Sequence, residues 1–301
     1  MPEPNLSVVV LAWNQADVTR SCIASVRANT AVGCELILVD NGSEPRLDAV
    51  LEDTGDVYVR NEDNLGFAAG MNRGLAAVTS RHVAFLNNDT VVPKRWAQPL
   101  LDTLTSSPSI GIVVPAVTAA GNPISVRSVA GTETIVVPPF RALPSAVAYV
   151  MVTETIRGLG GWDERYVPAT AEDLDLLWSV WVNGLDVVID ERVLIDHVGS
   201  ATIKQDLPQA GQVLRSNRML FVDRWTGADP DPPGLGLIGD DAFEQNLATA
   251  GVAAHWMRRA FAAEDTAAAM RREAAAQRIP APAEHRTRSR IGSLLDKLRG
   301  G

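Results

Sequence analysis

The chain has 301 residues, of which 46% are hydrophobic, so it is long enough to bury a sizeable core as one large domain or two smaller ones. Its formal net charge of −9 argues against a general nucleic-acid binder, which would present a basic surface, but leaves room for a local basic pocket. The two cysteines, Cys22 and Cys34, give no disulfide framework and no zinc spacing, so we expect free thiols in a reducing compartment. The first residues lack a signal-peptide pattern and no apolar run approaches the ~20 residues that span a bilayer. We therefore expect a cytoplasmic protein that at most touches the inner face of a membrane.

Short apolar runs alternate with amphipathic stretches in the first 115 residues. The run LSVVVLA at 6–12 is continuous, which is typical of a strand buried on both faces. In chain order we predict a strand at 6–12, a helix at 17–29, a strand at 35–39, a helix at 47–51, a strand at 57–59, a helix at 67–78 and a strand at 82–86. Strands that alternate with helices form βαβ units with right-handed crossovers. The pattern therefore predicts an α/β fold around a mostly parallel, Rossmann-like sheet flanked by helices.

The second half of the chain is less regular. Residues 116–145 contain proline, serine and glycine between β-branched patches, which predicts irregular strands or a loop. Further along we predict a strand at 146–153, a turn at 160–164, a helix at 173–183, a strand at 186–189, one helix within 207–227, a linker at 228–239, and helices at 241–258 and 262–278. Residues 116–205 are thus expected to build onto the same sheet, and a helical extension with a basic tail follows.

A small polar cluster follows each of the four strands predicted in the first half. The clusters are Trp13-Asn14, Asp40-Asn41-Gly42-Ser43, residues 61–64, and Asn87-Asn88-Asp89. In a parallel α/β sheet the ligand binds beyond the carboxyl ends of the strands, so the four clusters predict one shared binding edge. Turn formation explains any single cluster, because Asn, Asp, Gly and Ser favour turns, but it explains all four together poorly.

Seven segments carry a resemblance to a known family. They read SVVVLAWNQ, LILVDNGS, NLGFAAGMNRG, VAFLNNDTVVP, GGWDE, AEDLDLLW and DHVGS. In this order they resemble the family-2 glycosyltransferases, which have a GT-A fold, and within that family the bacterial rhamnosyltransferase-like members. The resemblance covers about residues 6–225.

The resemblance implies both a domain plan and an activity. The plan is a GT-A domain at 1–227, with a nucleotide-binding half at 1–115 and an acceptor-binding half at 116–227, followed by a helical extension at 228–301. The activity is metal-dependent, inverting transfer of a sugar from a nucleotide diphosphate to a hydroxyl of a saccharide, glycolipid or metabolite. The expected donor is dTDP-rhamnose, with UDP-hexoses next.

The resemblance also implies which residues bind the donor. A carboxylate at the end of a buried strand accepts the N3–H of a uracil or thymine ring, and the match at VDNGS gives this role to Asp40; capping by Asp40 and Ser43 is the alternative. The Gly-rich segment 64–74 runs into a helix start, where a diphosphate can approach the backbone, although close helix packing also selects small residues. The expected donor-binding residues are Trp13, Asn14, Asp40, Asn41, Asn64, Gly66, Asn72, Arg73 and Asn88.

Asn87-Asn88-Asp89-Thr90 resembles the D-x-D metal motif of the family. Hard oxygen ligands suit Mg²⁺ or Mn²⁺, and such an ion offsets the charge that builds on a departing nucleotide. The resemblance implies that Asp89 is a ligand and that His197, in DHVGS, approaches the metal or the diphosphate. A plain β-turn and a structural histidine are the alternatives.

Three acids open the helix predicted at 173–183. Inverting transfer needs a base that deprotonates the acceptor hydroxyl, and the match to the family's E-D motif gives this role to Asp173. Glu172 is then expected to orient the acceptor, with Trp162 on the acceptor side of the cleft. The alternatives are that the acids only favour the helix dipole and that Trp162 is a buried anchor.

The expected partners are a nucleotide-sugar donor and a hydroxyl acceptor, and no nucleic acid. The basic tail at 284–299 has Ile and Leu at helical spacing, which predicts either peripheral contact with an anionic membrane or a solvated terminus. Two other functions stay open at this stage. A sugar-phosphate nucleotidyltransferase would share the sheet, and a non-catalytic module would keep only the nucleotide pocket.

Overall fold

A computed structural model describes residues 5–31, 33–51, 56–118, 133–140, 147–197, 210–228 and 233–276. The chain divides into two compact units, Met1–Arg258 and Arg259–Gly301, and everything below concerns the first. Of the second unit, residues 259–276 are described, and they are helical. The basic tail at 284–299 lies outside the described residues, and the predicted domain boundary at residue 227 stays a prediction.

One sheet organises the first unit. Within the described residues its strands are β1 (Leu6–Ala12), β2 (Cys34–Asn41), β3 (Val57–Asn61), β4 (His82–Asn87), β5 (Thr90–Val91), β6 (Ile110–Thr118), β7 (Thr134–Val136), β8 (Ala148–Val152) and β9 (Asp186–His197). Their order is β3-β2-β1-β4-β8-β6-β9-β5, with β7 paired to β9. The pairs among β1 to β4 and the pair β6–β9 are parallel, whereas β8, β5 and β7 pair antiparallel. The predicted α/β fold with a mostly parallel sheet is confirmed.

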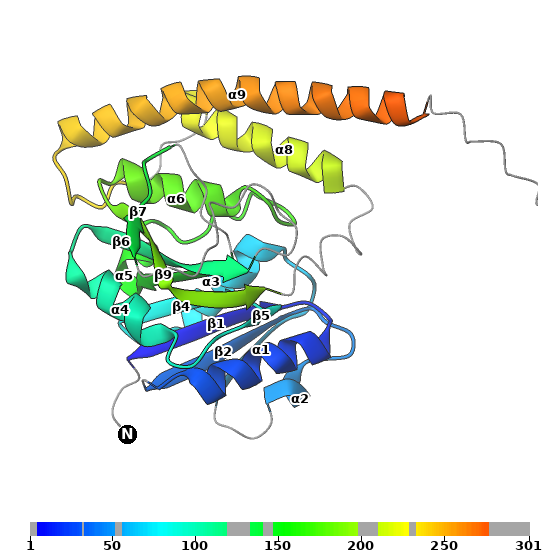
Figure 1. Cartoon of the computed structure of the whole chain (residues 1–301), viewed down its shortest axis with the longest axis vertical. Coiled ribbons are helices and arrows are strands. Elements are labelled where there is room, and N and C mark those ends of the chain that lie inside the picture. Colours follow the sequence, from blue (N-terminus) through cyan, green and yellow to red (C-terminus); the bar gives the residue numbers. More distant parts are fainter. Residues whose placement is uncertain are drawn as a thin grey trace, which may run out of the picture. The chain divides into compact units, whose positions relative to one another are not determined.

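Helices cover both faces of this sheet (Figure 1). The helices are α1 (Ala16–Asn29), α2 (Asp48–Leu51), α3 (Phe67–Ala77), α4 (Ala97–Ser106), α5 (Thr153–Gly158), α6 (Glu172–Val182), α8 (Ala210–Asp223), the π-helical η1 (Arg224–Ala228) and α9 (Asp240–Ala276). Side chains of α1 and α4 share a buried cluster with the sheet, and α3 and α6 pack on its other side. An aromatic cluster fixes α8 and η1 to α6, with Trp178 4.7 Å from Phe221 and 5.4 Å from Trp225 between ring centroids.

Three elements differ from the prediction for local reasons. β6 contains Pro115 and continues beyond it to Thr118. The strand accommodates this proline because its register with β9 shifts directly after it. The predicted strand at 186–189 extends to His197, since β9 bulges between Asp190 and Leu194 and then resumes its pairing. The two helices predicted near the C-terminus form one helix, α9, because residues 258–262 contain neither glycine nor proline.

Glycines let α3 lie unusually close to the sheet. A Cβ atom at Gly74 would lie 2.3 Å from Cγ1 of Val9, and one at Gly70 would lie 2.5 Å from Cδ1 of Leu11. The close-packing explanation of the Gly-rich segment is therefore correct for these two positions. The first turn of α3 begins at the carboxyl edge of the sheet, next to the end of β2.

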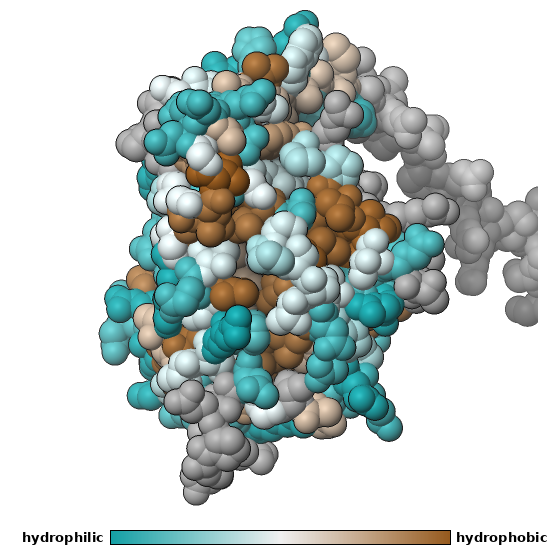
Figure 2. Space-filling model, turned by 90° about the vertical axis from the view of Figure 1, so that its left-hand side faces the viewer, coloured by the Kyte–Doolittle hydropathy of each residue, from teal (hydrophilic) through white to brown (hydrophobic). Residues whose placement is uncertain are grey.

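Both cysteines are free thiols, as predicted. Burial raises the pKa of the Cys22 thiol to about 11, with small opposing contributions from Thr90, so this thiol stays protonated. Within the described residues, no helix has the length and apolar character needed to cross a membrane. Figure 2 shows that hydrophobic residues on one face gather in separate patches among hydrophilic ones.

The contact between α3 and the sheet predicts the effect of one added methyl group. Gly74→Ala forces a Cβ against Val9 and should lower the free energy of unfolding by about 1–3 kcal/mol. Urea unfolding of the variant and of Ala76→Ser, at an exposed position of the same helix, measures this. The serine control should stay within about 0.5 kcal/mol of the parent. Equal stability of Gly74→Ala and the parent would contradict the close approach.

Candidate active site

The polar strand ends meet at one edge of the sheet. The register places Asp40 beside Ala12, Asn87 beside Leu11, and Asn61 beside Asn41. Because these strands are parallel, Trp13-Asn14, Asp40-Asn41 and Asn87-Asn88-Asp89 all leave the sheet on the same side. The predicted common edge is thus present in the structure.

Asp40 is fully buried and serves as the hub of the loop that follows β2. Its carboxylate accepts hydrogen bonds from the backbone amides of Ser43 (2.8 Å) and Leu47 (3.0 Å), from the Tyr58 hydroxyl, and from the Arg60 guanidinium (2.8 Å). Burial alone would raise the pKa of this carboxyl, but these hydrogen bonds outweigh it and lower the pKa. The capping alternative is therefore correct, and base recognition by Asp40 stays a prediction.

Tyr58 and Arg60 are site residues that the sequence analysis misses. They alternate with Val57 and Val59 along β3, so both project from one face of the strand. That alternation in VYVRN is the signal that was available in the sequence.

The loop after β1 is tied to the loop after β2. Asn14 donates its backbone amide to the Ser43 hydroxyl (2.8 Å), and its side-chain oxygen accepts the backbone amide of Glu44 (3.0 Å). Asn14 and Gln15 both have left-handed backbones, with φ of 56° and 54°. Such strain is held where the surrounding loop over-determines it. Trp13, which precedes these residues, is half-buried.

Asparagine side chains shape the loop that leads into α3. Asn41 donates to Oδ1 of Asn64 (2.9 Å) and to the carbonyl of Gly66 (3.0 Å), and it accepts from Asn61 (2.9 Å). Oδ1 of Asn64 also accepts the Gly66 amide (2.9 Å). Asn41 and Asn64 thus have structural roles, and their contact with a donor stays a prediction.

A seam joins α3 to the segment before α6. The amide of Phe67 donates to the carbonyl of Pro168 (2.7 Å), and a Cβ at Gly66, whose φ is +86°, would lie 2.7 Å from the same oxygen. Asn72 on α3 exchanges two hydrogen bonds with the backbone of Trp162, at 2.8 and 2.9 Å. The Asn72 amide therefore connects two parts of the fold, and the predicted donor contact is not needed to explain it. Arg73, its neighbour, is exposed.

The acceptor role expected for Trp162 is corrected by its burial. Only 2% of the residue is exposed, and its ring packs edge-on against Phe67 and Phe85 at 5.4 and 5.7 Å. A side chain enclosed in this way offers no face to an acceptor, so the anchor alternative holds.

Asp89 and His197 come together because β5 pairs with the end of β9. The antiparallel register sets Thr90 opposite His197, and Nε2 of His197 lies 3.2 Å from Oδ2 of Asp89. Asn88 points elsewhere and donates to the Thr19 hydroxyl (3.0 Å). Within the described residues no three His, Cys, Asp or Glu side chains gather closely enough to hold a metal on their own. One carboxylate and one imidazole do fit a divalent cation that takes its remaining oxygen ligands from a diphosphate.

Two neighbouring carboxylates open α6, and their environments differ. Burial, together with the charge of Asp173, raises the pKa of Glu172 well above its ordinary value. Burial also raises the pKa of Asp173, but that carboxylate accepts the backbone amide of Leu174 at 2.8 Å, which favours its charged form. Because Oε2 of Glu172 has no hydrogen-bond partner among the described residues, whereas Asp173 accepts the Leu174 amide, we expect a proton on Glu172 and the negative charge on Asp173.

Tyr149 is a third residue that the sequence analysis misses. It lies on β8 opposite Phe85, near the carboxyl end of β4. Its buried hydroxyl has no hydrogen-bond partner among the described residues, and its pKa is raised by burial and by the charges of Asp173 and Glu172. The acid pair therefore lies within electrostatic range of a β8 side chain whose partner strand, β4, leads on to Asp89.

Asp175 belongs to a buried brace beneath the acid pair. It accepts hydrogen bonds from the Tyr166 hydroxyl (3.1 Å) and the Trp225 indole (2.9 Å), and it lies 3.2 Å from Nε of Arg224. Arg224 also pairs with Asp163 in the Gly-Gly-Trp-Asp-Glu turn. Burial raises the pKa of Asp175 to about 6 although Arg224 lowers it.

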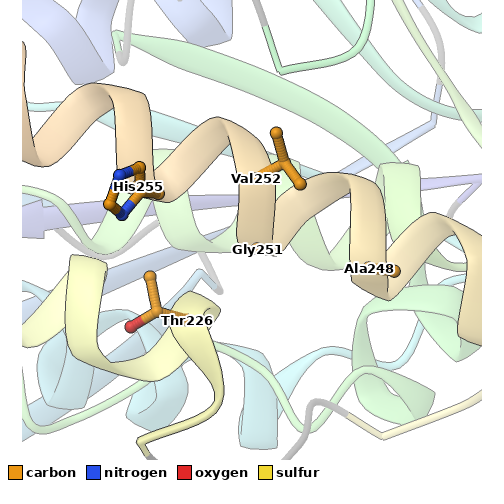
Figure 3. A pocket seen from close by; sticks show the side chains of 5 residues that line it. All are labelled: Thr226, Ala248, Gly251, Val252 and His255. Atoms are coloured by element: carbon orange, nitrogen blue, oxygen red, sulfur yellow. The ribbon is translucent and has the colours of Figure 1, made fainter.

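A hollow of about 380 Å³ lies away from this edge. Thr226 of η1 lines it from one side, and Ala248, Gly251, Val252 and His255 line it from successive turns of α9 (Figure 3). Its lining contains none of the carboxylates described above, so this hollow is not where the predicted chemistry would take place.

Comparisons with known proteins agree with this geometry. Residues 7–135 match the family described as Glycosyl transferase family 2. A pre-mycofactocin glycosyltransferase of Mycobacterium tuberculosis is 29% identical over 208 residues, which cover 64% of this chain and 42% of that protein. A glucosyl-dolichyl phosphate glucuronosyltransferase of Haloferax volcanii is 30% identical over 120 residues, 36% of this chain and 38% of that protein. The chain thus spans less than half the length of these two relatives.

Solved glycosyltransferase structures share the fold. GalNAc-T7 with UDP, GalNAc and Mn²⁺ aligns with a TM-score of 0.55 at 16% identity, over 76% of this chain and 52% of that one. S. aureus TarS 1-349 aligns with a TM-score of 0.56 at 15% identity, over 84% and 72%. The mannosyltransferase PcManGT from Pyrobaculum calidifontis, in complex with GDP-Man and Mn²⁺, aligns with a TM-score of 0.53 at 16% identity, over 91% and 80%. The predicted GT-A fold is confirmed.

The raised pKa of Asp175 predicts a pH-dependent stability. Since the folded chain holds this proton up to about pH 6 and the unfolded chain releases it near pH 4, stability from Asp175 is present below pH 4 and is lost as the pH rises to 6. Relative to Asp175→Asn, the parent should lose roughly 3 kcal/mol of unfolding free energy over this range, at 1.36 kcal/mol per pKa unit. Urea unfolding at pH 4, 5, 6 and 7 tests this, with the exposed Asp17→Asn as control. Parallel curves for the parent and Asp175→Asn would contradict the assignment.

Proposed function

We propose that the chain is an inverting glycosyltransferase that moves one sugar from a nucleoside diphosphate to an acceptor hydroxyl. The observation that carries the proposal is that His197 and Asp89 meet beyond the carboxyl end of β4, while two acids open α6. Asp89 and His197 offer a cation site there, and the Glu172–Asp173 pair offers a base. The family match over residues 7–135 and the Mn²⁺ in two structural relatives support it.

The reaction follows from the protonation states of the acid pair. Asp173, ionised, accepts the proton of the acceptor hydroxyl as that oxygen attacks the anomeric carbon. The new C–O bond forms on the face opposite the bond to the diphosphate, whose electron pair leaves with the diphosphate oxygen, so the anomeric configuration inverts. Asp89 and His197 would hold Mg²⁺ or Mn²⁺, which supplies positive charge against the departing diphosphate.

The donor half would bind the nucleotide through the loops that follow β1 and β2. Trp13 is half-buried and free to stack on a base, and the Asp40 hub keeps the adjoining loop in place. A uracil or thymine base, and rhamnose as the sugar, remain our proposal for the donor. The rhamnosyltransferase-like subtype and the acceptor class, whether saccharide, glycolipid or metabolite, belong to the same proposal.

A thermal-shift panel tests the donor class. UDP-, dTDP- and GDP-sugars, each with and without Mn²⁺, should raise the melting temperature in proportion to their binding, and a dTDP- or UDP-sugar with Mn²⁺ should raise it most. Transfer to an acceptor, or slow hydrolysis of the same donor, then separates an enzyme from a binding module. Release of pyrophosphate from a nucleoside triphosphate would instead indicate a nucleotidyltransferase.

Replacing Asp173, the proposed base, should abolish sugar transfer and leave donor binding unchanged. Asp173→Asn keeps the shape of the side chain but cannot take a proton, so kcat should fall by about 10²–10⁴-fold while donor affinity is unchanged. The matched control is Asp186→Asn at the amino end of β9, on the opposite edge of the sheet, where the carboxylate pairs with Ser109. Initial rates and donor calorimetry measure both quantities. Full activity of Asp173→Asn would refute the assignment.

The cation site predicts a metal-linked loss of donor affinity. Asp89→Ala and His197→Ala should each weaken donor binding in Mn²⁺ by at least about tenfold, since even partners of metal ligands are worth that much. Binding without Mn²⁺ should change little. His255→Ala, in the hollow beside η1, is the control and should behave as the parent. Equal Mn²⁺ dependence in all four proteins would rule out this site.

A further inference from the structure

One buried side-chain amide on α8 hydrogen-bonds the segment that leads into the acid pair. Asn217 is 5% exposed, and its side-chain nitrogen donates to the carbonyl of Ala169 (2.9 Å) and to the carbonyl of Thr170 (3.1 Å). The same nitrogen lies 3.4 Å from the Thr170 hydroxyl. A single side chain from a distant helix therefore fixes two successive peptides.

This segment, Thr170–Ala171, has a strained backbone that neighbouring groups must stabilise. Thr170 and Ala171 have φ of +89° and +74°, in the left-handed region that side chains other than glycine rarely adopt. For a β-branched threonine this conformation is especially rare. Two such residues in a row persist only when neighbouring groups fix them, and Asn217 bonds the carbonyl of the first.

The same segment contacts the acid pair directly. Ala171 is the N-cap residue of α6, its carbonyl accepts the Asp175 amide at 3.0 Å, and Glu172 and Asp173 follow it directly. The backbone of Thr170 lies close enough to the Glu172 carboxylate to lower its pKa. The second oxygen of that carboxylate, Oε2, is buried with no hydrogen-bond partner among the described residues. The position of Glu172 thus depends on a peptide whose other end is held by Asn217.

We propose that Asn217 is a positioning residue for the acid pair, acting through the Thr170 peptide on Glu172 and through it on Asp173. This inference rests on the proposed function in so far as the pair performs the chemistry. Without Asn217 the Thr170–Ala171 backbone relaxes, Glu172 loses one of its two backbone partners, and the acid pair is no longer held in place at the start of α6.

The groups that face Glu172 set the direction of the effect. They are Asp173 and Asp175 on its own helix and Tyr149 from β8. Because the Thr170 contact favours the charged form of Glu172, its loss should raise the pKa of that carboxyl further. The pair then keeps its last proton, the one on Glu172, to a higher pH, so the alkaline limb of the rate profile should move to higher pH.

Asn246 provides a matched control. Its side-chain nitrogen, on α9, donates to the carbonyl of Val182 at the opposite end of α6 (3.2 Å). Asn246→Ala therefore removes the same kind of bond to the same helix, at the end that carries no acids. A merely structural role for Asn217 would make the two alanine variants behave alike.

The experiment compares the parent, Asn217→Ala, Asn217→Gln and Asn246→Ala, each shown to be folded by circular dichroism. We expect kcat of Asn217→Ala to fall by about 10–100-fold, as for a small misplacement of catalytic groups, with the donor KM unchanged and the alkaline limb shifted upward. Asn217→Gln, which keeps the amide, should recover part of kcat. Asn246→Ala should lose stability without these changes. Identical pH profiles for Asn217→Ala and the parent would overturn the proposal.

A second readout keeps this test independent of activity. In protein labelled with ¹³C at glutamate carboxyls, and assigned with Glu172→Gln, the titration midpoint of Glu172 should move upward in Asn217→Ala and stay in place in Asn246→Ala. An unmoved midpoint in Asn217→Ala would overturn the proposal even if the enzyme were inactive. Conversely, a parent chain that neither transfers nor hydrolyses any nucleotide sugar would contradict the proposed function and leave the Glu172 titration to decide on Asn217.

Discussion

The seam between α3 and the segment 160–168 ties the carboxyl edge of the sheet, where we propose the donor site, to the start of α6, where we propose the base. The Phe67 amide donates to the Pro168 carbonyl, and Asn72 exchanges two hydrogen bonds with the Trp162 backbone, so the helix that begins at the carboxyl edge holds the segment that precedes α6. The bonds between Asn72 and Trp162 are partly buried beside the Trp162 ring and its aromatic neighbours, where an unmade hydrogen bond is costly. The distance between the proposed donor site and the proposed base is therefore set by backbone geometry and not by long, mobile side chains.

This seam also changes how the Gly-rich segment is understood. A helix N-terminus attracts anions because its first amides lack partners, yet the Phe67 amide at the start of α3 is already bonded to Pro168. Gly66 is required there because a Cβ would collide with the same carbonyl, and Gly74 because a Cβ would collide with Val9. Packing thus accounts for these glycines, and a bound diphosphate would have to use the amides that remain.

Much of this edge follows from the sequence, since buried apolar runs predict strands and parallel strands deliver their ends to one side. The sequence also predicts the pairing of Asp89 with His197 through family resemblance, although the bulge in β9 that lets the strand reach His197 has no local signature. Residues such as Tyr149 and Asn217 escape prediction because their roles depend on contacts across 23 and more positions of chain, which periodicity does not encode. Trp162 shows the opposite error, in which a motif position suggested a ligand contact and burial excludes it.

The acid pair shows how one fold separates two similar carboxylates. Both lie in the first turn of α6, where the helix dipole favours negative charge, so the dipole alone would ionise both. Burial opposes this, and it weighs more heavily on Glu172, which has an unpartnered oxygen, than on Asp173, which accepts the Leu174 amide. We therefore expect one proton on Glu172 and one charge on Asp173, which is the state that the proposed base needs. The family match ends at residue 135, so this division of roles stems from the later half of the chain, where α6 is braced by Arg224 and by α8.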